Sequence, residues 1–494
     1  MSTAPSRITP RRIRLGVVRG ISYGLFATPD PFMDAARSVG AGLVRLYVYW
    51  SQVEPERGRY DWSVVDAILA EADADADVDL WITVCSSSMW GTRTPTDFQP
   101  PSPAVDEEAY SAFVAALVRH CRGRVRSWQC DNEPSNTGLL WAGTATEYAH
   151  QLHLFAAAVR AADPEAYVVL GGCGYDMLGS PEGSPQRAFY DEVAGAGRDD
   201  FDLFSVNLYD DPHRTPEHIE TARAVMRAHG YERPVVVGEY NGPTLFQFPA
   251  ATAALEHTMM AAFAAAASGE PASMSTAELA EQAAAETPDR RALRDLYARR
   301  AEVPPELGMF MAGAPAELAE RRERLARRQL LQRALLALAS GAGALACWNL
   351  APEVPDYTDP YNIMDLMFGT LALMDYADGA IRTPRPAARA HRLLAAVVAG
   401  AVDVRTVAVP DEPDVMAVRI DMGAGAAARM AVWLRRDDPL DESAGPRPIT
   451  LPWPHAEVHA VDAYGEPVRV ASADGRAGVG VTPVPVVLSA TPVG

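Results

Sequence analysis

The sequence of 494 residues contains few cysteines and no long hydrophobic run. No two of the five cysteines have CxxC spacing, and their number is odd: Cys85, Cys121, Cys130, Cys173 and Cys347. A disulfide framework and a structural zinc site are therefore not expected, and the composition favours a reducing compartment. No segment reaches the roughly 18 consecutive apolar residues that a membrane-spanning helix requires, so we expect no membrane partner.

The N-terminal segment also lacks the pattern of a secretory signal. It reads MSTAPSRITPRRIRLGVV, in which the basic residues are not followed by an apolar core and a small-residue cleavage site. Together with the cysteine pattern, this segment predicts a cytoplasmic protein.

Basic residues are in deficit as well. The chain has 44 Lys and Arg against 64 Asp and Glu, which gives a formal net charge of -20. Such a surface repels phosphate backbones and anionic lipids, which argues against nucleic-acid binding. The ten histidines show no metal-ligand spacing, and HExxH, P-loop and nucleophile-elbow motifs are missing. We expect neither a cofactor nor a required metal ion.

What the sequence does contain is a regular alternation of two kinds of segment between about residues 13 and 400. Eight short apolar runs begin at Ile13, Ala41, Asp79, Arg124, Ala166, Asp202, Arg233 and Gly343. Helix-like segments lie between them, among others around Met33, Val64, Ala112, Tyr148, Phe189 and Ile219. The alternation predicts an α/β fold with a parallel sheet, and a closed (β/α)8 TIM barrel is favoured over a doubly wound open sheet.

Two segments go beyond a minimal barrel. A helical insertion at about 250–340, rich in Ala, Glu and Arg, separates the seventh and eighth predicted strands, and Ser275 with Glu278 forms a candidate capping box there. The insertion is expected to be a lid or an oligomer contact. Residues 401–494 contain short alternating runs between Gly, Pro and Asp turns. They predict a small C-terminal antiparallel β domain after a catalytic barrel of residues 1–400.

Two glutamates stand at the ends of predicted strands. Glu133 follows the fourth strand within CDNEPSN, and Glu239 closes the seventh within VVVGEYNGP. The C-terminal ends of all barrel strands face one side, so both carboxyl groups should reach the same pocket. Retaining glycosidases need two such groups about 5–5.5 Å apart, one as nucleophile and one as general acid/base. The pair fits this requirement, and the family resemblance described next implies Glu133 as acid/base and Glu239 as nucleophile.

These motifs carry a family resemblance. Asn132-Glu133-Pro134 after strand four, with Glu239 at strand seven, resembles clan A of the TIM-barrel glycoside hydrolases. That clan includes β-galactosidases, β-xylosidases, α-iduronidases and endo-β-glucanases. The resemblance extends to residues 43–62, LVRLYVYWSQVEPERGRYDW. It continues with Tyr209 after strand six and Trp348 after strand eight.

The resemblance implies roles for four further residues. Asn132 would hydrogen-bond the 2-hydroxyl of the sugar, a contact that strengthens in the transition state. Arg45 would lie beside Glu239 and keep that carboxylate ionised, and Tyr209 would donate a hydrogen bond to it. Trp348 would form the apolar floor under the sugar ring. Arg45 has an alternative partner in Glu54, and Tyr209 and Trp348 have an alternative role in packing.

The sequence departs from the commonest clan pattern after strand three. Relatives often carry a sugar ligand there, whereas this chain has Cys85-Ser-Ser-Ser-Met89-Trp90. The resemblance therefore leaves open which of these residues touches the substrate.

The predicted reaction is hydrolysis of a β-type glycosidic bond through a covalent glycosyl–Glu239 intermediate. We expect exo action on small glycosides or oligosaccharides, with a carbohydrate as the partner and a homo-oligomer as an open possibility. A catalytically silent carbohydrate-binding barrel and an endo-acting β-glycanase are the alternatives. A lyase or isomerase would normally show a Lys or a metal cluster at the strand ends, and none is present.

Overall fold

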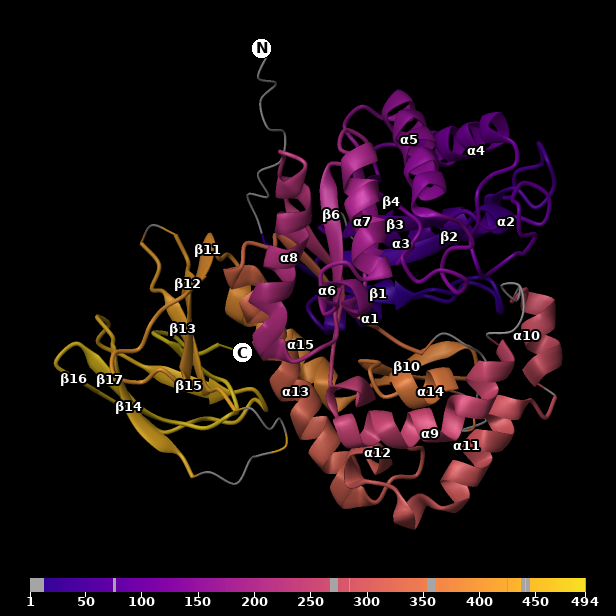
Figure 1. The fold of residues 1–494 in the computed structure, drawn as a ribbon. Coiled ribbons are helices and arrows are strands. Elements are labelled where there is room, and N and C mark those ends of the chain that lie inside the picture. The colour runs from indigo at the N-terminus through magenta and orange to yellow at the C-terminus, as the bar shows by residue number, and fades with distance from the viewer. Residues whose placement is uncertain are drawn as a thin grey trace.

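The computed structural model describes residues 13–73, 77–266, 274–283, 285–352, 361, 363–423, 425–436, 440 and 445–493. Eight parallel strands close into a barrel in sequence order. Figure 1 shows the arrangement of the whole fold. The strands are β1 (Arg14–Gly20), β2 (Leu43–Tyr49), β3 (Asp79–Cys85), β4 (Val125–Cys130), β5 (Tyr167–Cys173), β6 (Leu203–Leu208), β7 (Val235–Tyr240) and β8 (Ala344–Cys347). All eight apolar runs form these strands, so the predicted closed barrel is confirmed.

A helix follows each barrel strand and covers it on the outside. These helices are α1 (Met33–Ser38), α3 (Ser63–Asp73), α4 (Glu107–His120), α5 (Ala145–Ala162), α7 (Pro185–Ala196), α8 (Thr215–Ala228), α13 (Ala316–Ala339) and α15 (Pro386–Val398). Local sequence sets their starts: Asp106 accepts a hydrogen bond from Ala109 N, and Thr144 with Glu147 forms a capping box at α5. Strands β2 and β7 are buried along their whole length, on both faces, which explains why their sequences are largely apolar.

The helical insertion between β7 and β8 has a core of its own. It contains α9 (Pro249–Ala266), α10 (Thr276–Ala283), α11 (Pro288–Ala298) and α12 (Pro305–Gly308). Phe248, Leu293, Leu307 and Phe310 are buried together within it. The capping box at α10 is confirmed, because Ser275 N donates to Glu278 Oε2 at 2.8 Å and Glu278 N donates to Ser275 Oγ at 3.2 Å.

The long helix α13 belongs to both regions. Leu325, near its middle, packs into the core of the insertion. Leu330, Leu335 and Leu338 pack into the core of the barrel. These leucines are therefore buried inside the chain, and α13 takes the place of the seventh barrel helix.

The insertion contacts the C-terminal end of the barrel. Backbone hydrogen bonds join Met274, just before α10, to Gln99 in the loop after β3. Thr276 N also donates to Asp97 Oδ1 at 2.8 Å. Strands β7 and β3 are four positions apart in a ring of eight, so they stand on opposite sides of the barrel. The insertion, which follows β7, is therefore also attached to the loop on the opposite side of the barrel.

The C-terminal region forms two antiparallel sheets packed face to face. One contains β11 (Asp403–Thr406), β12 (Val415–Asp421), β13 (Arg429–Leu434), β18 (Val486–Ser489) and β15 (His459–Asp462), and the other β14 (Arg447–Pro452), β17 (Arg476–Val481) and β16 (Val470–Ala473). Strand β16 is mostly exposed and consists largely of small residues, whereas every second residue of β17 (Ala477, Val479 and Val481) is buried between the sheets. The antiparallel β domain is confirmed.

This β domain is joined closely to the barrel. Val418, Ile420 and Trp433 are buried in the same cluster as the barrel core. The indole N–H of Trp433 donates to Nε2 of His213, in the loop after β6, at 3.0 Å. In Figure 1 the domain lies beside α8, α13 and α15, away from the insertion helices α9–α12.

A short helix, α14 (Ile363–Phe368), and a hairpin of β9 (Met374–Ala377) and β10 (Ala380–Pro384) connect β8 to α15. Within the described ranges no helix is long and apolar enough to cross a membrane.

Candidate active site

The two predicted catalytic glutamates stand at the same end of the barrel. Glu239 is part of β7 and is 5% exposed, and Glu133 lies three residues after β4 and is half-buried. Asp131 and Glu133 both have a left-handed backbone, with φ of 51° and 45°. Such a conformation in non-glycine residues costs about 1–3 kcal/mol each and persists where the surrounding structure imposes it. Here the hydrogen bond from Glu133 N to Gly172 O, at 3.0 Å, fixes the turn.

Four side chains converge on the carboxylate of Glu239. Arg45 Nη1 lies 3.1 Å from Oε1, and the hydroxyl of Tyr47 donates to the same oxygen at 2.8 Å. Asn132 Nδ2 is 3.4 Å from Oε1, and the hydroxyl of Tyr209 donates to Oε2 at 2.7 Å. The side chain of Glu239 is only 7% exposed, so these donors replace the water that a carboxylate would otherwise bind.

Both tyrosines are held in the protonated form. Burial raises the pKa of Tyr47 and of Tyr209 well above the usual value, and the negative charge of Glu239 raises it further. Each phenol therefore keeps its proton at neutral pH and acts as a donor to Glu239. This matches what a carboxylate nucleophile requires, namely hydrogen bonds to its charged form.

Arg45 is fixed at the floor of the site. It is fully buried, and its guanidinium also donates to Gly238 O at 2.8 Å, Asn132 Oδ1 at 2.8 Å and Thr83 Oγ1 at 3.0 Å. Because Asn132 Oδ1 accepts from Arg45, the amide nitrogen of Asn132 points toward Glu239. The alternative partner, Glu54, instead accepts from Trp50 Nε1 at 2.8 Å.

A second side-chain amide, that of Asn207, binds Glu133. Asn207 Nδ2 donates to Glu133 Oε1 at 2.6 Å, and Asn207 itself is completely buried. Two glycines leave room for this amide. A Cβ at Gly172 would lie 2.9 Å from Asn207 Oδ1, and a Cβ at Gly238 would lie 3.1 Å from it. Glycine at these two strand positions thus allows the amide to lie between Glu133 and the barrel interior.

The serines after β3 make hydrogen bonds within the protein, next to the proposed site. Ser86 donates through N and Oγ to the buried Asp131, at 2.8 and 2.7–2.9 Å. Burial raises the pKa of Asp131 to about 6, and the hydrogen bonds from Ser86 lower it in part. Ser87 Oγ donates to Phe98 O, and Ser88 Oγ accepts from Gly91 N. All three serines are fully buried, so at this departure from the clan pattern they bind the protein itself.

Trp348 follows β8 at the same end and is partly exposed. It packs against a hydrophobic cluster that includes Tyr47 and Tyr49.

The structure thus brings all six predicted site residues to one end of the barrel, and Arg45, Asn132 and Tyr209 contact Glu239 directly. The sequence analysis missed Tyr47 and Asn207. The signal was present, because Tyr47 is two residues from Arg45 on β2, and Asn207 is two residues from Tyr209 across the end of β6.

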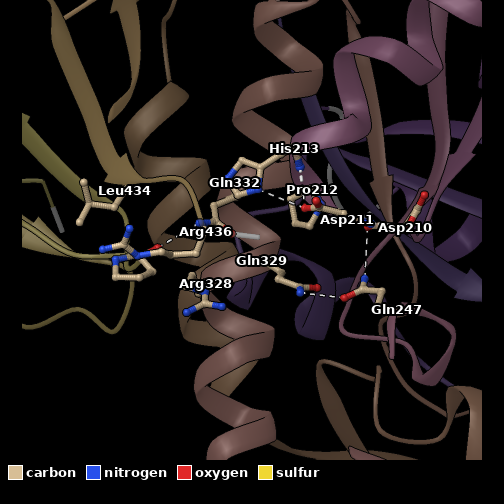
Figure 2. A pocket seen from close by; sticks show the side chains of 11 residues that line it. Asp210, Asp211, Pro212, His213, Gln247, Arg328, Gln329, Gln332, Leu434 and Arg436 are labelled. Carbon is tan, nitrogen blue, oxygen red and sulfur yellow. Dashed lines mark hydrogen bonds and ion pairs between the residues drawn. The ribbon is translucent and has the colours of Figure 1, made fainter. Parts of the chain in front are cut away.

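A separate pocket lies behind the site, where the barrel meets the β domain. The pocket has a volume of about 200 Å³, and Figure 2 shows the side chains that line it. They come from the loop after β6, the segment after β7, α13 and the β domain: Asp210, Asp211, Pro212, His213, Gln247, Arg328, Gln329, Gln332, Leu434, Arg436 and Pro483. Gln329 Nε2 donates to Gln247 Oε1, and Gln247 Nε2 donates to Tyr209 O, both at 2.8 Å. The pocket wall thus supports the backbone of Tyr209.

Over the described part of the chain, no group of three or more His, Cys, Asp or Glu side chains is arranged to hold a metal ion.

The fold is similar to that of solved glycoside hydrolases. A family 39 glycoside hydrolase from Bacteroides cellulosilyticus WH2 aligns with a TM-score of 0.60 at 14% identity, covering 98% of this chain and 81% of that one. A glucosidase from Croceicoccus marinus aligns with a TM-score of 0.57 at 15% identity, over 98% and 97% of the two chains. A monomeric β-xylosidase from Caulobacter crescentus CB15 aligns with a TM-score of 0.55 at 11% identity, over 94% and 92%. No protein-family model matches the chain, and no curated protein matches it in sequence. The likeness establishes a common barrel architecture.

Proposed function

We propose that this protein is a retaining glycoside hydrolase that cleaves β-type glycosidic bonds. The observation that carries the proposal is the environment of Glu239, a buried carboxylate that receives hydrogen bonds from Arg45, Tyr47 and Tyr209. Glu133 stands at the same end of the barrel and is bound by Asn207. A carboxylate that accepts several hydrogen bonds and lies at the same end of the barrel as a second carboxyl group suits double displacement.

In the first step Glu239 attacks the anomeric carbon, and the bond to the leaving oxygen breaks while Glu133 protonates that oxygen. The donors around Glu239 orient it before the substrate arrives, so little reorganisation is needed during the attack. Asn132 presents its amide nitrogen beside Glu239, where it can hydrogen-bond the 2-hydroxyl of the sugar.

In the second step water hydrolyses the glycosyl ester. Glu133, now ionised, takes a proton from the water as its oxygen attacks the anomeric carbon, and Glu239 leaves as the carboxylate. The amide of Asn207 donates to the carboxylate of Glu133, which suits this base form. The product keeps the configuration of the substrate because two inversions have occurred.

We further propose exo action. The insertion follows β7 and is attached to the loop after β3 on the opposite side of the barrel, where Met274 pairs with Gln99 and Thr276 with Asp97. Attachment at both sides of the barrel favours a closed pocket over an open cleft. A pocket closed at one end accepts the terminal sugar of a chain and excludes internal units.

A panel of 4-nitrophenyl glycosides in both anomeric forms tests the proposal. Purified protein should release nitrophenol from at least one β-glycoside, and proton NMR should show that the β-anomer of the sugar forms first. Glu239→Gln, which keeps the shape of the side chain and removes its charge, is the matched control and should be inactive. Binding of sugars without hydrolysis by the wild-type protein would instead indicate a silent carbohydrate-binding barrel.

A further inference from the structure

The backbone of Tyr209 lies just beyond the end of its strand. Strand β6 ends at Leu208, and the last pair that it forms with β7 joins Leu208 to Tyr240. The hydroxyl of Tyr209 donates to Oε2 of Glu239 at 2.7 Å. A hydrogen bond weakens steeply when its donor is misaligned, so the position of the Tyr209 backbone affects how firmly Oε2 is held.

Two side chains from the loop after β7 bind the carbonyl group of Tyr209. Thr244 Oγ1 donates to Tyr209 O at 3.4 Å, and Gln247 Nε2 donates to the same oxygen at 2.8 Å. Gln247 Nε2 also donates to the next carbonyl, Asp210 O, at 3.2 Å. The segment that follows Glu239 in the chain therefore also holds the tyrosine that binds Glu239.

The amide of Gln247 can face the two carbonyls in only one orientation. Carbonyl oxygens only accept hydrogen bonds, so the nitrogen of Gln247 must face Tyr209 and Asp210. Its oxygen accepts from Nε2 of the buried Gln329, on α13, at 2.8 Å, a contact that Figure 2 shows. If Gln247 were flipped, its oxygen would face the two carbonyls and its nitrogen would face the nitrogen of Gln329. Helix α13 thus fixes which atom of Gln247 meets Tyr209.

Helix α13 also binds the same backbone segment directly. Arg333 is completely buried one turn after Gln329, and its Nη2 donates to Asp210 O. Glycine at position 242, in the loop after β7, leaves room for both side chains. A Cβ at Gly242 would lie 2.4 Å from Gln329 Oε1 and 2.9 Å from Arg333 Nη1. The loop after β7 and α13 together hold the backbone of residues 209–210.

Resting on the proposed function, we infer that Gln247 is a positioning residue for the nucleophile. Its amide holds the backbone of Tyr209, so that the phenol stays on Oε2 of Glu239. No described contact joins Gln247 to Glu239 or Glu133, so its effect on the reaction passes through Tyr209. The alternative is that Gln247 only satisfies two carbonyl oxygens and thereby contributes to stability.

Gln247→Leu tests the inference, because it keeps a similar size and removes the donor. Loss of a neutral hydrogen bond corresponds to roughly a 2- to 13-fold fall in kcat. The substrate should be an aryl glycoside with a poor leaving group, so that formation of the glycosyl ester limits turnover. KM should then change little, because the loss arises in the transition state. Gln247→Glu, which keeps the acceptor for Gln329 and removes only the donor, should show the same pattern.

Gln332→Leu is the matched control on α13. Gln332 is buried, and its Nε2 donates to Pro483 O in the β domain at 3.0 Å. The substitution therefore removes another glutamine-to-carbonyl hydrogen bond, away from Tyr209. Its melting temperature should fall about as much as that of Gln247→Leu, whereas its kcat should equal that of the wild type. An equal fall of kcat in both variants would show that activity follows stability, and would overturn the inference.

A double-mutant cycle with Tyr209→Phe shows whether Gln247 acts through the phenol. Without the hydroxyl there is no hydrogen bond left to position. In the Tyr209→Phe background, Gln247→Leu should therefore lower kcat/KM by less than about twofold. If the two losses multiply in full, Gln247 acts by another route and the inference is overturned.

The outcomes separate this inference from the proposed function. If the wild-type protein hydrolyses no glycoside, the proposed function fails, and the role of Gln247 fails with it. If the wild type is active and both Gln247→Leu and Gln247→Glu keep its kcat, only the positioning role is overturned.

Discussion

The hydroxyl of Tyr209 donates a 2.7 Å hydrogen bond to Oε2 of Glu239, whereas three donors share Oε1 of the same carboxylate. Among the described contacts, the two oxygens of the proposed nucleophile thus accept different numbers of hydrogen bonds. Arg45 and Asn132 remain on Oε1 when Tyr47 is changed, but Oε2 depends on Tyr209. This asymmetry leads to a quantitative expectation for the two tyrosines.

Tyr209→Phe should lower kcat/KM more than Tyr47→Phe. A hydrogen bond to a charged group contributes about 1.5–3 kcal/mol, which corresponds to roughly 10- to 150-fold in rate for Tyr209. The loss for Tyr47 should be smaller, because two donors stay on Oε1. Steady-state kinetics on one aryl glycoside, with a melting curve for each variant to confirm folding, measures the difference. A larger loss for Tyr47→Phe would contradict the unequal roles.

Glu239→Ala should lower turnover by several orders of magnitude, because the covalent intermediate can no longer form. Azide can enter the space that the carboxylate has left and attack the same face of the anomeric carbon. Added azide should therefore restore part of the activity and give the α-glycosyl azide, which NMR identifies. Formation of the β-azide, or unchanged activity, would show that Glu239 is not the nucleophile.

Glu133→Ala should affect substrates according to their leaving groups. A poor leaving group needs protonation as the bond breaks, whereas an activated phenol does not. Alkyl or sugar leaving groups should lose far more activity than dinitrophenyl glycosides, and the basic limb of the pH–rate profile should flatten. A uniform loss across a series of leaving groups would refute the acid/base role.

Asp131 should make stability depend on pH in the acidic range. Burial raises the pKa of Asp131 to about 6 from its ordinary value of 3.8. The folded state therefore binds the proton more tightly than the unfolded chain does. This contribution to stability is fully present below about pH 3.8 and is lost as the pH rises through about 6. The shift of roughly two pKa units corresponds to about 3 kcal/mol.

The check on Asp131 is a comparison with Asp131→Asn. Between about pH 4 and 7 the free energy of unfolding of the wild-type protein, relative to that of the variant, should fall by up to about 3 kcal/mol. Urea unfolding at several pH values measures this, and Asp34→Asn on the surface controls for the substitution itself. A difference that does not change with pH would mean that Asp131 does not titrate in this range.

Exo action predicts the product pattern on an oligosaccharide labelled at the reducing end. Monosaccharide should be released stepwise, and the labelled chain should shorten by one unit at a time. A ladder of mid-chain fragments at early times would show that the insertion leaves an open cleft. Shortening the insertion by deleting residues 267–283 should then shift a genuine exo enzyme toward longer products.

Much of this organisation could be predicted from local sequence. Strands that are buried on both faces read as continuous apolar runs, and a barrel places every strand end on one side, so Glu133 and Glu239 could be paired across 106 positions. The capping box at Ser275 was visible because its two residues are three positions apart. These features depend on neighbours along the chain or on a topology that the alternation of elements implies.

Other features depended on contacts between distant segments. Tyr47 and Asn207 reach the two glutamates because of the strand register, and the room for Asn207 comes from Gly172 and Gly238 on neighbouring strands. The leucines of α13 look alike in sequence, yet Leu325 packs in the insertion and Leu335 in the barrel. The sequence by itself therefore determined the elements and the pair of carboxyl groups, through periodicity and strand-end position. Only the tertiary structure decided which side chains surround them, because that is set by packing between residues that are far apart in the chain.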